Sequence, residues 1–314
     1  MLKLEYLAFN NNNTKRSVLN MYKQFKIYVM AKILVTGATG NTCSILIPEL
    51  LRAGQEVRAF VRNEEKAQSL KDAGAEIYVG DLDRGDTIDG ALEGIEKVYL
   101  CTWNGPTASK QGINVVEAIK RAGTFPFVVR HSAFGAAGSE LIQQINEVDK
   151  ALQESGVPWT SIKPTFFMQN MMMAAESIQN GGQIYWDWAD GKAGMIDIRD
   201  VADSALGALT GRAEEGKEYI LTGPESISMY DVAASFANVL SKSINYVAVP
   251  HEASKESMMG MGFPEFIVDG YVELSRGFSQ GFADTTNGNV ETLSGHAPRS
   301  IDDFTKDFKS FFES

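Results

Sequence analysis

The sequence predicts an α/β fold in which a doubly wound parallel sheet is followed by a smaller, mixed α/β region. Two observations carry this prediction. Residues 33–35 form a short apolar run typical of a buried strand, and a glycine turn and an amphipathic helical pattern follow it directly. Strand and helix patterns then alternate as far as residue 163, which favours parallel strands joined by right-handed helical crossovers. Together they indicate a Rossmann-type domain.

The turn at residues 36–43 is the candidate phosphate-binding element. Gly37 permits a tight turn, and Gly40 lets the backbone approach a pyrophosphate at a helix N-terminus, where free N–H groups and the helix dipole favour an anion. Cys43 stands where close helix–strand packing usually has Gly or Ala, and we expect this small residue to shift the helix only slightly. An ordinary turn without a cofactor is the alternative, but a second strand at residues 55–61 favours the cofactor.

The other elements follow from periodicity. In the sheet half we expect helices at 64–73, 84–92, 107–122 and 143–155, and strands at 76–80, 97–102, 125–130 and 159–163. The pattern changes after Pro164. A Met-rich apolar stretch at 166–180 ends at a Gly-Gly pair, and a short strand beginning at residue 196 feeds a helix that ends near residue 211. Further strands are expected at 218–221 and 246–249, and helices at 229–240, 252–259, 264–277 and 301–312.

These patterns divide the chain into three parts. Residues 1–29 are predicted to be disordered or an upstream extension, residues 30–165 a nucleotide-binding domain to which 195–222 return, and residues 166–314 a smaller substrate-binding region. That region would close over the carboxyl ends of the strands, where ligands bind in such sheets. The first part carries a net charge of +4, which leaves −15 for the remainder. A transit peptide is the alternative for it, but we expect the compact protein to begin at Met30.

Composition limits the class of protein. Hydrophobic residues make up 44% of the chain and charged residues 22%, as in ordinary globular proteins. The formal net charge of −11 disfavours direct binding of nucleic acid, and no stretch reaches the ~18–20 apolar residues of a membrane span. The two cysteines, Cys43 and Cys101, suggest a reducing compartment and make no metal site by themselves. We therefore expect a cytoplasmic protein without a bound metal.

Several short motifs carry a resemblance to a known family. They are Val35-Thr36-Gly37-Ala38-Thr39-Gly40, Val57-Arg58-Ala59-Phe60-Val61-Arg62, Gly80-Asp81-Leu82, the segment 155–164, Phe167-Met168-Gln169-Asn170, the segment 197–202 and Leu221-Thr222-Gly223-Pro224-Glu225. With these motifs, about residues 31–250 resemble the NmrA-like family of atypical short-chain dehydrogenases/reductases. Members of that family include NAD(P)H-dependent quinone, azo-dye and triphenylmethane-dye reductases and ergot-alkaloid-type dehydrogenases. Others bind the nucleotide without catalysis and act as redox sensors.

The resemblance implies a set of cofactor-binding residues in four loops. They are Gly37, Thr39, Gly40, Asn41 and Thr42 around the pyrophosphate, Arg62 at a 2′-phosphate, Asp81 and Leu82 beside the adenine, and Thr102 and Trp103 near the ribose or nicotinamide. The second strand ends in Arg62 without an Asp or Glu, which suits a phosphate better than a bare ribose diol. We therefore predict NADPH as the cofactor, with NADH as the alternative. A solvated surface arginine remains the other interpretation of Arg62, and a helix N-cap that of Asp81.

A complete acid–base pair is not evident. The expected helix at 143–155 contains no tyrosine and so lacks the Tyr-x-x-x-Lys pair typical of short-chain dehydrogenases. Ser132, which matches the family's serine after the fifth strand, is the candidate catalytic residue. Its hydroxyl could bind a substrate carbonyl or the nicotinamide ribose, or it could cap the next segment. We expect His131 to be packed rather than catalytic, and a reductase of this kind can take its proton from water.

The substrate is expected at the start of the Met-rich stretch. Aromatic rings and flexible thioethers there suit a flat apolar molecule. The residues assigned to it are Phe166, Phe167, Met168 and Asn170. Simple core packing is the alternative for this segment. Tyr185, Trp186 and Trp188 either line the same pocket or form an exposed hairpin.

Two functions fit these features. One is an NAD(P)H-dependent oxidoreductase that reduces a small flat electrophile, such as a quinone, a dye or an iminium-like acceptor, by hydride transfer. The other is a non-catalytic NAD(P)-sensing regulator that binds a partner protein. The missing acid–base pair favours the regulator, whereas the aromatic and Met-rich rim favours the oxidoreductase. We expect the oxidoreductase.

Overall fold

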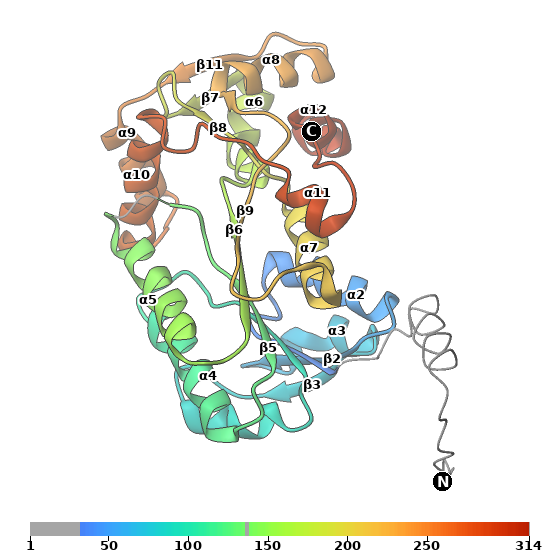
Figure 1. Ribbon diagram of the computed structural model, residues 1–314. Helices are drawn as coiled ribbons and strands as arrows, with labels where there is room; N and C mark the ends of the chain where they lie inside the picture. The colour runs from blue at the N-terminus through green and yellow to red at the C-terminus, as the bar shows by residue number, and fades with distance from the viewer. Residues whose placement is uncertain (1–31, 136–137, 314) are drawn as a thin grey trace, which may run out of the picture.

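A seven-stranded sheet lies at the centre of the protein. The computed structural model describes residues 32–135 and 138–313, so the prediction for residues 1–29 falls outside the described residues. The strand order is β3-β2-β1-β4-β5-β6-β9, and all neighbouring strands are parallel (Figure 1). The strands are β1 (Lys32–Val35), β2 (Glu56–Val61), β3 (Glu76–Val79), β4 (Lys97–Leu100), β5 (Phe127–His131), β6 (Trp159–Pro164) and β9 (Glu218–Leu221). This order reverses between β1 and β4 and confirms the predicted doubly wound fold.

Helices cover both faces of the sheet (Figure 1). One face carries α2 (Asn41–Arg52), α3 (Gln68–Asp72) and α7 (Ile198–Gly207), and the other carries α4 (Ala108–Ala122) and α5 (Glu140–Glu154). Residues of β1 alternate between the two cores. Ile33 and Val35 are buried with α2 and α7, whereas Leu34 is buried with α4 and α5. The side-chain period of two along a strand is the reason.

The last strand of the sheet comes from much later in the chain. After β6 the chain leaves the sheet, returns through α7, and adds β9 parallel to β6. The helix continues as a wider turn at Ala208–Arg212, where Gly211 has a φ of +100°. Glycine adopts this left-handed conformation without a steric penalty. The helix therefore ends near residue 211, as the sequence predicts.

The smaller region consists of short elements around a second, aromatic core. Its strands form a parallel pair, β7 (Gln183–Trp186) with β11 (Asn245–Ala248), and an antiparallel pair, β8 (Lys192–Ala193) with β10 (Ile227–Ser228). Helix α11 (Asn289–Ser294) packs on α7, and its Val290 and Leu293 belong to the core of the sheet half. The helices of the smaller region are α6 (Ala175–Gly181), α8 (Met229–Leu240), α9 (His251–Gly260), α10 (Glu265–Ser279), α12 (Ile301–Asp307) and α13 (Lys309–Glu313). Trp188, Phe236, Phe304 and Phe312 are fully buried among them.

Some elements differ from expectation. The segment 84–92 forms two 3₁₀ turns, Gly85–Thr87 and Asp89–Leu92, rather than an α-helix, because its glycines weaken a regular helix. Helix α5 begins at Glu140 rather than at residue 143, since the Ser139 hydroxyl accepts the Ile142 N–H and caps it. Helix α11 and the strands β7, β8 and β10 were not expected.

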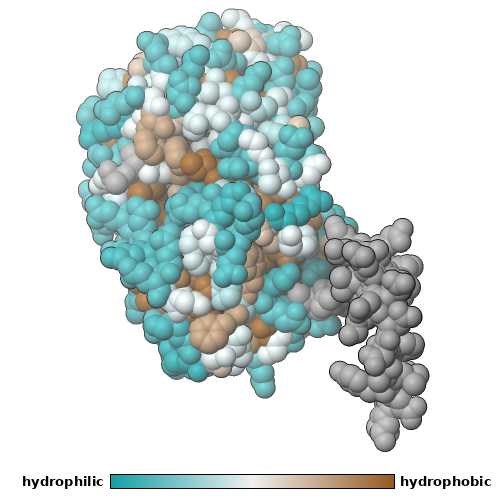
Figure 2. Space-filling view, viewed as in Figure 1, coloured by the Kyte–Doolittle hydropathy of each residue, from teal (hydrophilic) through white to brown (hydrophobic). Residues whose placement is uncertain are grey.

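The surface is mainly polar on the face shown in Figure 2, where hydrophobic residues gather between the sheet half and the smaller region. Within the described residues, no helix combines the length and the apolar character needed to cross a membrane.

Candidate cofactor and substrate site

The glycine turn after β1 forms a cradle that a side chain would fill. Gly37 has a φ of +62°, and a Cβ atom there would lie 3.0 Å from the carbonyl oxygen of Cys101. Gly40 precedes α2 and donates its N–H to Gly37 O (2.8 Å). No side chain caps α2, and no acidic residue lies in its first turn. The start of α2 therefore offers free N–H groups and a positive dipole end to an anion.

Thr36 ties the end of β1 to the loop after β4. Its hydroxyl donates to Cys101 O (2.7 Å) and accepts the Cys101 N–H (2.9 Å). The Cys43 thiol is fully buried, 3.7 Å from Thr36 O. Cysteine thus fills the position that usually holds Gly or Ala, and α2 still packs against β1.

The two arginines of the β2 segment have different surroundings. Arg58 is buried and donates to the backbone carbonyls of Ala91 (2.7 Å) and Glu93 (2.9 Å), and it pairs with Glu76 (2.9 Å). Arg62 is exposed and has no hydrogen bond or ion pair with the described part of the chain. Of the two, only Arg62 is free to meet a phosphate.

Asp81 and Leu82 shape the loop after β3. The Asp81 carboxylate accepts the N–H of Asp83 (3.0 Å), and the Asp81 N–H donates to the Thr87 hydroxyl (2.9 Å). Asp81 therefore closes a turn of its own, whereas Arg84 is the residue at the N-cap of the next 3₁₀ turn. Leu82 is buried.

A cavity of about 800 Å³, the cofactor cavity, lies at the carboxyl ends of the strands beside the glycine cradle. The predicted site residues that line it are Gly40, Asn41, Thr42, Thr102, Trp103, Ser132, Phe166, Phe167 and Asn170. The predicted site residues outside its wall are Gly37, Thr39, Arg62, Asp81, Leu82 and Met168. Its position agrees with the rule that open parallel sheets bind ligands at this edge.

Ser132 lines the cofactor cavity, but its hydroxyl donates a hydrogen bond into a buried ionic network. Its hydroxyl donates to Asp149 (2.6 Å), and Asp149 also pairs with Arg130 (3.2 Å) and Lys163 (3.3 Å). Ser139, and not Ser132, caps the following helix. Ser132 can still accept a hydrogen bond, but in this arrangement it links β5 to α5 rather than donating to a ligand.

His131 is held by a neighbouring strand. Its Nδ1 lies 2.6 Å from the Tyr99 hydroxyl, and the two rings meet edge to face at 5.8 Å. Complete burial raises the pKa of Tyr99, so the phenol stays protonated at neutral pH. The His131 ring is thus held against Tyr99, and it also lines the cofactor cavity.

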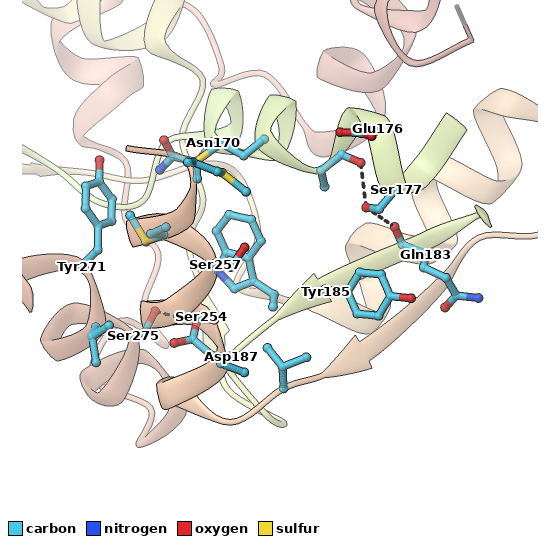
Figure 3. Close-up of a pocket in the computed structure, with 18 of the residues that line it drawn as sticks. Asn170, Glu176, Ser177, Gln183, Tyr185, Asp187, Ser254, Ser257, Tyr271 and Ser275 are labelled. Atoms are coloured by element: carbon cyan, nitrogen blue, oxygen red, sulfur yellow. Dashed lines mark hydrogen bonds between the residues drawn. The ribbon is translucent and has the colours of Figure 1, made fainter. Parts of the chain in front are cut away.

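A second cavity of about 680 Å³, the apolar chamber, adjoins the first. Four residues line both: Phe166, Asn170, Tyr271 and Ser275. The other walls of the chamber are rich in aromatic and thioether side chains, including Met173, Tyr185, Trp186, Met258 and Met261. Figure 3 shows Tyr185 and Tyr271 on opposite sides of the chamber. An apolar space therefore adjoins the cofactor cavity.

Met168, an expected substrate residue, and Trp188, for which two placements were open, both occupy the core. Met168 is buried in the smaller region's core and lines neither cavity, so the core-packing alternative holds for it. Trp188 is also fully buried, with its ring centroid 4.6 Å from that of Phe166. Tyr185 and Trp186 line the chamber from β7, which pairs in parallel with β11 and forms no hairpin with it.

Tyr271 is the site residue that sequence reasoning missed. It lies on α10 where the two cavities meet, and its hydroxyl has no hydrogen-bond partner within residues 32–135 and 138–313. Burial raises its pKa, which keeps the phenol protonated at neutral pH. The residues around Tyr271 in the sequence give no signal of a binding site, because α10 is brought to the site by packing on α5 through Leu141, Ile145 and Leu274.

A model of the NmrA-like family matches residues 30–292. The chain belongs to the NmrA-like family. Among its relatives, an NAD(P)H azoreductase of Xenophilus azovorans is 34% identical over 281 residues, which cover 87% of this chain and 96% of the relative.

Two solved structures resemble this NmrA-like protein in fold. An NADPH-dependent quinone oxidoreductase of Escherichia coli, complexed with NADPH, superposes with a TM-score of 0.81 at 24% identity, over 88% of this chain and 99% of that one. NmrA, a negative transcriptional regulator in complex with NADP, gives 0.73 at 18% identity, over 88% and 94% of the two chains. The predicted family, fold and oxidoreductase class are thereby confirmed.

Proposed function

We propose that this NmrA-like protein is an NAD(P)H-dependent oxidoreductase that transfers hydride to a small flat electrophile, such as a quinone, a dye or an iminium-like molecule. One observation carries the proposal: the cofactor cavity, which lies beside the glycine cradle, and the apolar chamber share a wall of four residues. A hydride donor and a flat acceptor held in these adjoining spaces would be positioned to react. The similarity to an azoreductase over nearly the whole chain supports the same class of reaction.

The cofactor would be NADPH, with NADH as the alternative. The cradle fits a pyrophosphate because its turn has no side chain at Gly37 and its helix start is uncapped. Asn41 and Thr42 would hold that group together with Gly40, and Arg62 would meet the 2′-phosphate. When bound, the cofactor supplies the hydride, while the protein binds and orients it. The complexes of the two structural neighbours with NADPH and NADP support this assignment.

The acceptor would lie in the apolar chamber with a polar edge toward Tyr271. A phenol that stays protonated can donate a hydrogen bond to the acceptor atom that gains negative charge, and then its proton. Water would afterwards restore the phenol's proton. Phe166 and Trp186 offer apolar faces to a flat ring. We assign the donor role to Tyr271 and not to Ser132, whose proton goes to Asp149.

The direct test follows NADPH oxidation by its near-ultraviolet absorbance, with menadione, an azo dye and a triphenylmethane dye as separate acceptors. Oxidation that requires both the protein and one of these acceptors is the expected result. Tight NADPH binding in calorimetry without oxidation in the presence of any of them would refute the proposal.

A non-catalytic NAD(P)-sensing regulator is the second candidate. The observation that favours it is the engagement of both polar side chains at the end of β5, Ser132 with Asp149 and His131 with Tyr99. A regulator would use the same glycine cradle and bind a partner protein elsewhere. The calorimetry described above, read together with the turnover assay, separates the two candidates.

A further inference from the structure

We propose that the apolar chamber selects flat aromatic acceptors that carry a positive charge and discriminates against sulfonated or carboxylated ones. This inference rests on the proposed function in so far as the chamber receives the acceptor. It concerns the sign of the acceptor's charge, which neither the family nor the apolar character of the site decides.

The ionisable side chains of the chamber wall carry the first part of the argument. Two carboxylates, Glu176 and Asp187, belong to the wall, and no lysine, arginine or histidine is among the described residues that line it. Glu176 is exposed and has no ion pair or hydrogen bond with the described part of the chain. Figure 3 shows the two carboxylates at different parts of the wall. A bound cation would therefore meet an uncompensated negative charge at Glu176.

Asp187 is more fully engaged than Glu176. It is buried, and its carboxylate accepts the Ser275 hydroxyl (2.8 Å) and lies 2.9 Å from Nδ1 of His251. These contacts fix Asp187 in the wall and reduce its attraction for a ligand. Glu176 is consequently the residue on which the charge preference depends most.

The cations near the chamber have other partners. On α9, Lys255 pairs with Asp269 (2.6 Å), and on α10, Arg276 pairs with Glu273 (2.9 Å). Neither cation lines the chamber. A sulfonate would therefore give up its hydration without gaining a cationic partner, which is unfavourable.

The aromatic walls add a second attraction for cations. Tyr185, Trp186 and Tyr271 all line the chamber, and ring faces of this kind attract a cation that lies over them. Thioethers from Met258 and Met261 are polarizable and adapt to a flat ring. Residues 30–314 also carry a formal charge of −15, so the field of the whole molecule draws cations toward it.

Binding of two fluorescent probes tests the charge preference without turnover. The probes are thioflavin T, a flat aromatic cation, and anilinonaphthalene sulfonate, an aromatic anion, each titrated into the full-length protein with saturating NADPH. Thioflavin T should bind more tightly, and Glu176→Gln should weaken it by roughly 3- to 10-fold, as expected for removing one charge about 6 Å away in a watery site. Glu176→Lys should weaken it further and strengthen binding of the sulfonate.

Glu147→Gln is the matched control, because Glu147 is an exposed carboxylate on α5 that lines neither cavity. It changes the net charge equally and should move neither dissociation constant. Equal or tighter binding of the sulfonate to the native protein would overturn the inference. So would a Glu176→Gln variant that behaves like Glu147→Gln.

A parallel turnover assay keeps this inference separate from the proposed function. It compares kcat/KM for naphthoquinone and its sulfonated analogue. Reduction of both with equal efficiency, together with equal probe binding, would overturn the charge preference and leave the oxidoreductase intact. A cation preference in probe binding without turnover of any acceptor would refute the oxidoreductase and leave the charge preference standing.

Discussion

Replacing Gly37 by alanine tests whether the cradle depends on a missing side chain. Gly37 has a φ of +62°, and a left-handed conformation costs an L-residue roughly 1–2 kcal/mol. The new Cβ would also lie 3.0 Å from Cys101 O, so the loop after β4 must move, at a cost of roughly 1–2 kcal/mol more. We expect Gly37→Ala to lose about 2–4 kcal/mol of unfolding free energy. Because the same loop carries Thr102 and Trp103, NADPH should also bind at least about tenfold more weakly.

Gly54→Ala separates the two costs. Gly54 has a φ of +77° after the end of α2, but a Cβ there would meet no atom within 4 Å. Gly54→Ala should therefore lose only roughly 1–2 kcal/mol of unfolding free energy, and its affinity for NADPH should be unchanged. Urea unfolding without cofactor and calorimetry with NADPH measure both quantities. Equal losses of unfolding free energy in the two variants, with native NADPH affinity in Gly37→Ala, would refute the reasoning.

Four further changes test other parts of the site. Arg62→Ala should weaken NADPH binding by roughly 10- to 150-fold and leave the affinity for NADH nearly unchanged. The control Lys150→Ala, on the outer face of α5, should change neither affinity. Equal weakening of both cofactors would show that Arg62 does not bind the 2′-phosphate. Tyr185→Ala removes a ring that lines the apolar chamber and not the cofactor cavity, so it should raise KM for menadione with little change in NADPH affinity, and a native KM would remove this ring from the acceptor site. Tyr271→Phe should lower kcat by roughly 10- to 100-fold with a nearly unchanged KM, and a native kcat would remove the phenol from proton transfer. Burial alone would raise the pKa of Asp197, but hydrogen bonds from the neighbouring guanidinium outweigh it and hold that pKa below its ordinary value. This stabilisation is present above the unfolded-state pKa and is lost as the pH falls through the folded-state pKa. In Asp197→Asn, the free energy of unfolding should therefore fall less steeply as the pH is lowered into the acid range. An unchanged acid dependence would contradict a lowered pKa at Asp197.

The sheet and its glycine turn could be predicted because they depend on short-range pattern. Strand β1 is apolar at each of its last three positions since it is buried on both faces. Gly37 follows two residues after the strand ends because the turn needs a positive φ. Helix α8 has the same ends in the sequence prediction and in the structure. Its capping box, in which Ser228 and Asp231 satisfy each other's backbone N–H groups, is also a local signal.

The contacts of individual polar and sulfur-containing side chains depend on partners that are distant in the sequence. The Ser132 hydroxyl turns to Asp149, one element later on α5, because a buried carboxylate beside two cations is a stronger acceptor than any neighbour in the chain. Arg58 and Arg62 point to the same side of a predicted strand, but only Arg58 faces Glu76 on β3. Met168 lies within a stretch whose neighbours line a cavity, but it is itself covered by the smaller region.

What the sequence by itself determined is the order of the elements, the phosphate-binding turn and the arginine at the tip of β2, since each follows from residues close together in the chain. What only the tertiary structure decided is the acceptor chamber, whose wall joins residues 166–187 to residues 249–275. Tyr271 and Glu176 come from these two separate segments. Their meeting depends on how α10 packs against α5 and the second core, and packing between distant apolar faces leaves no mark in the local periodicity of either segment.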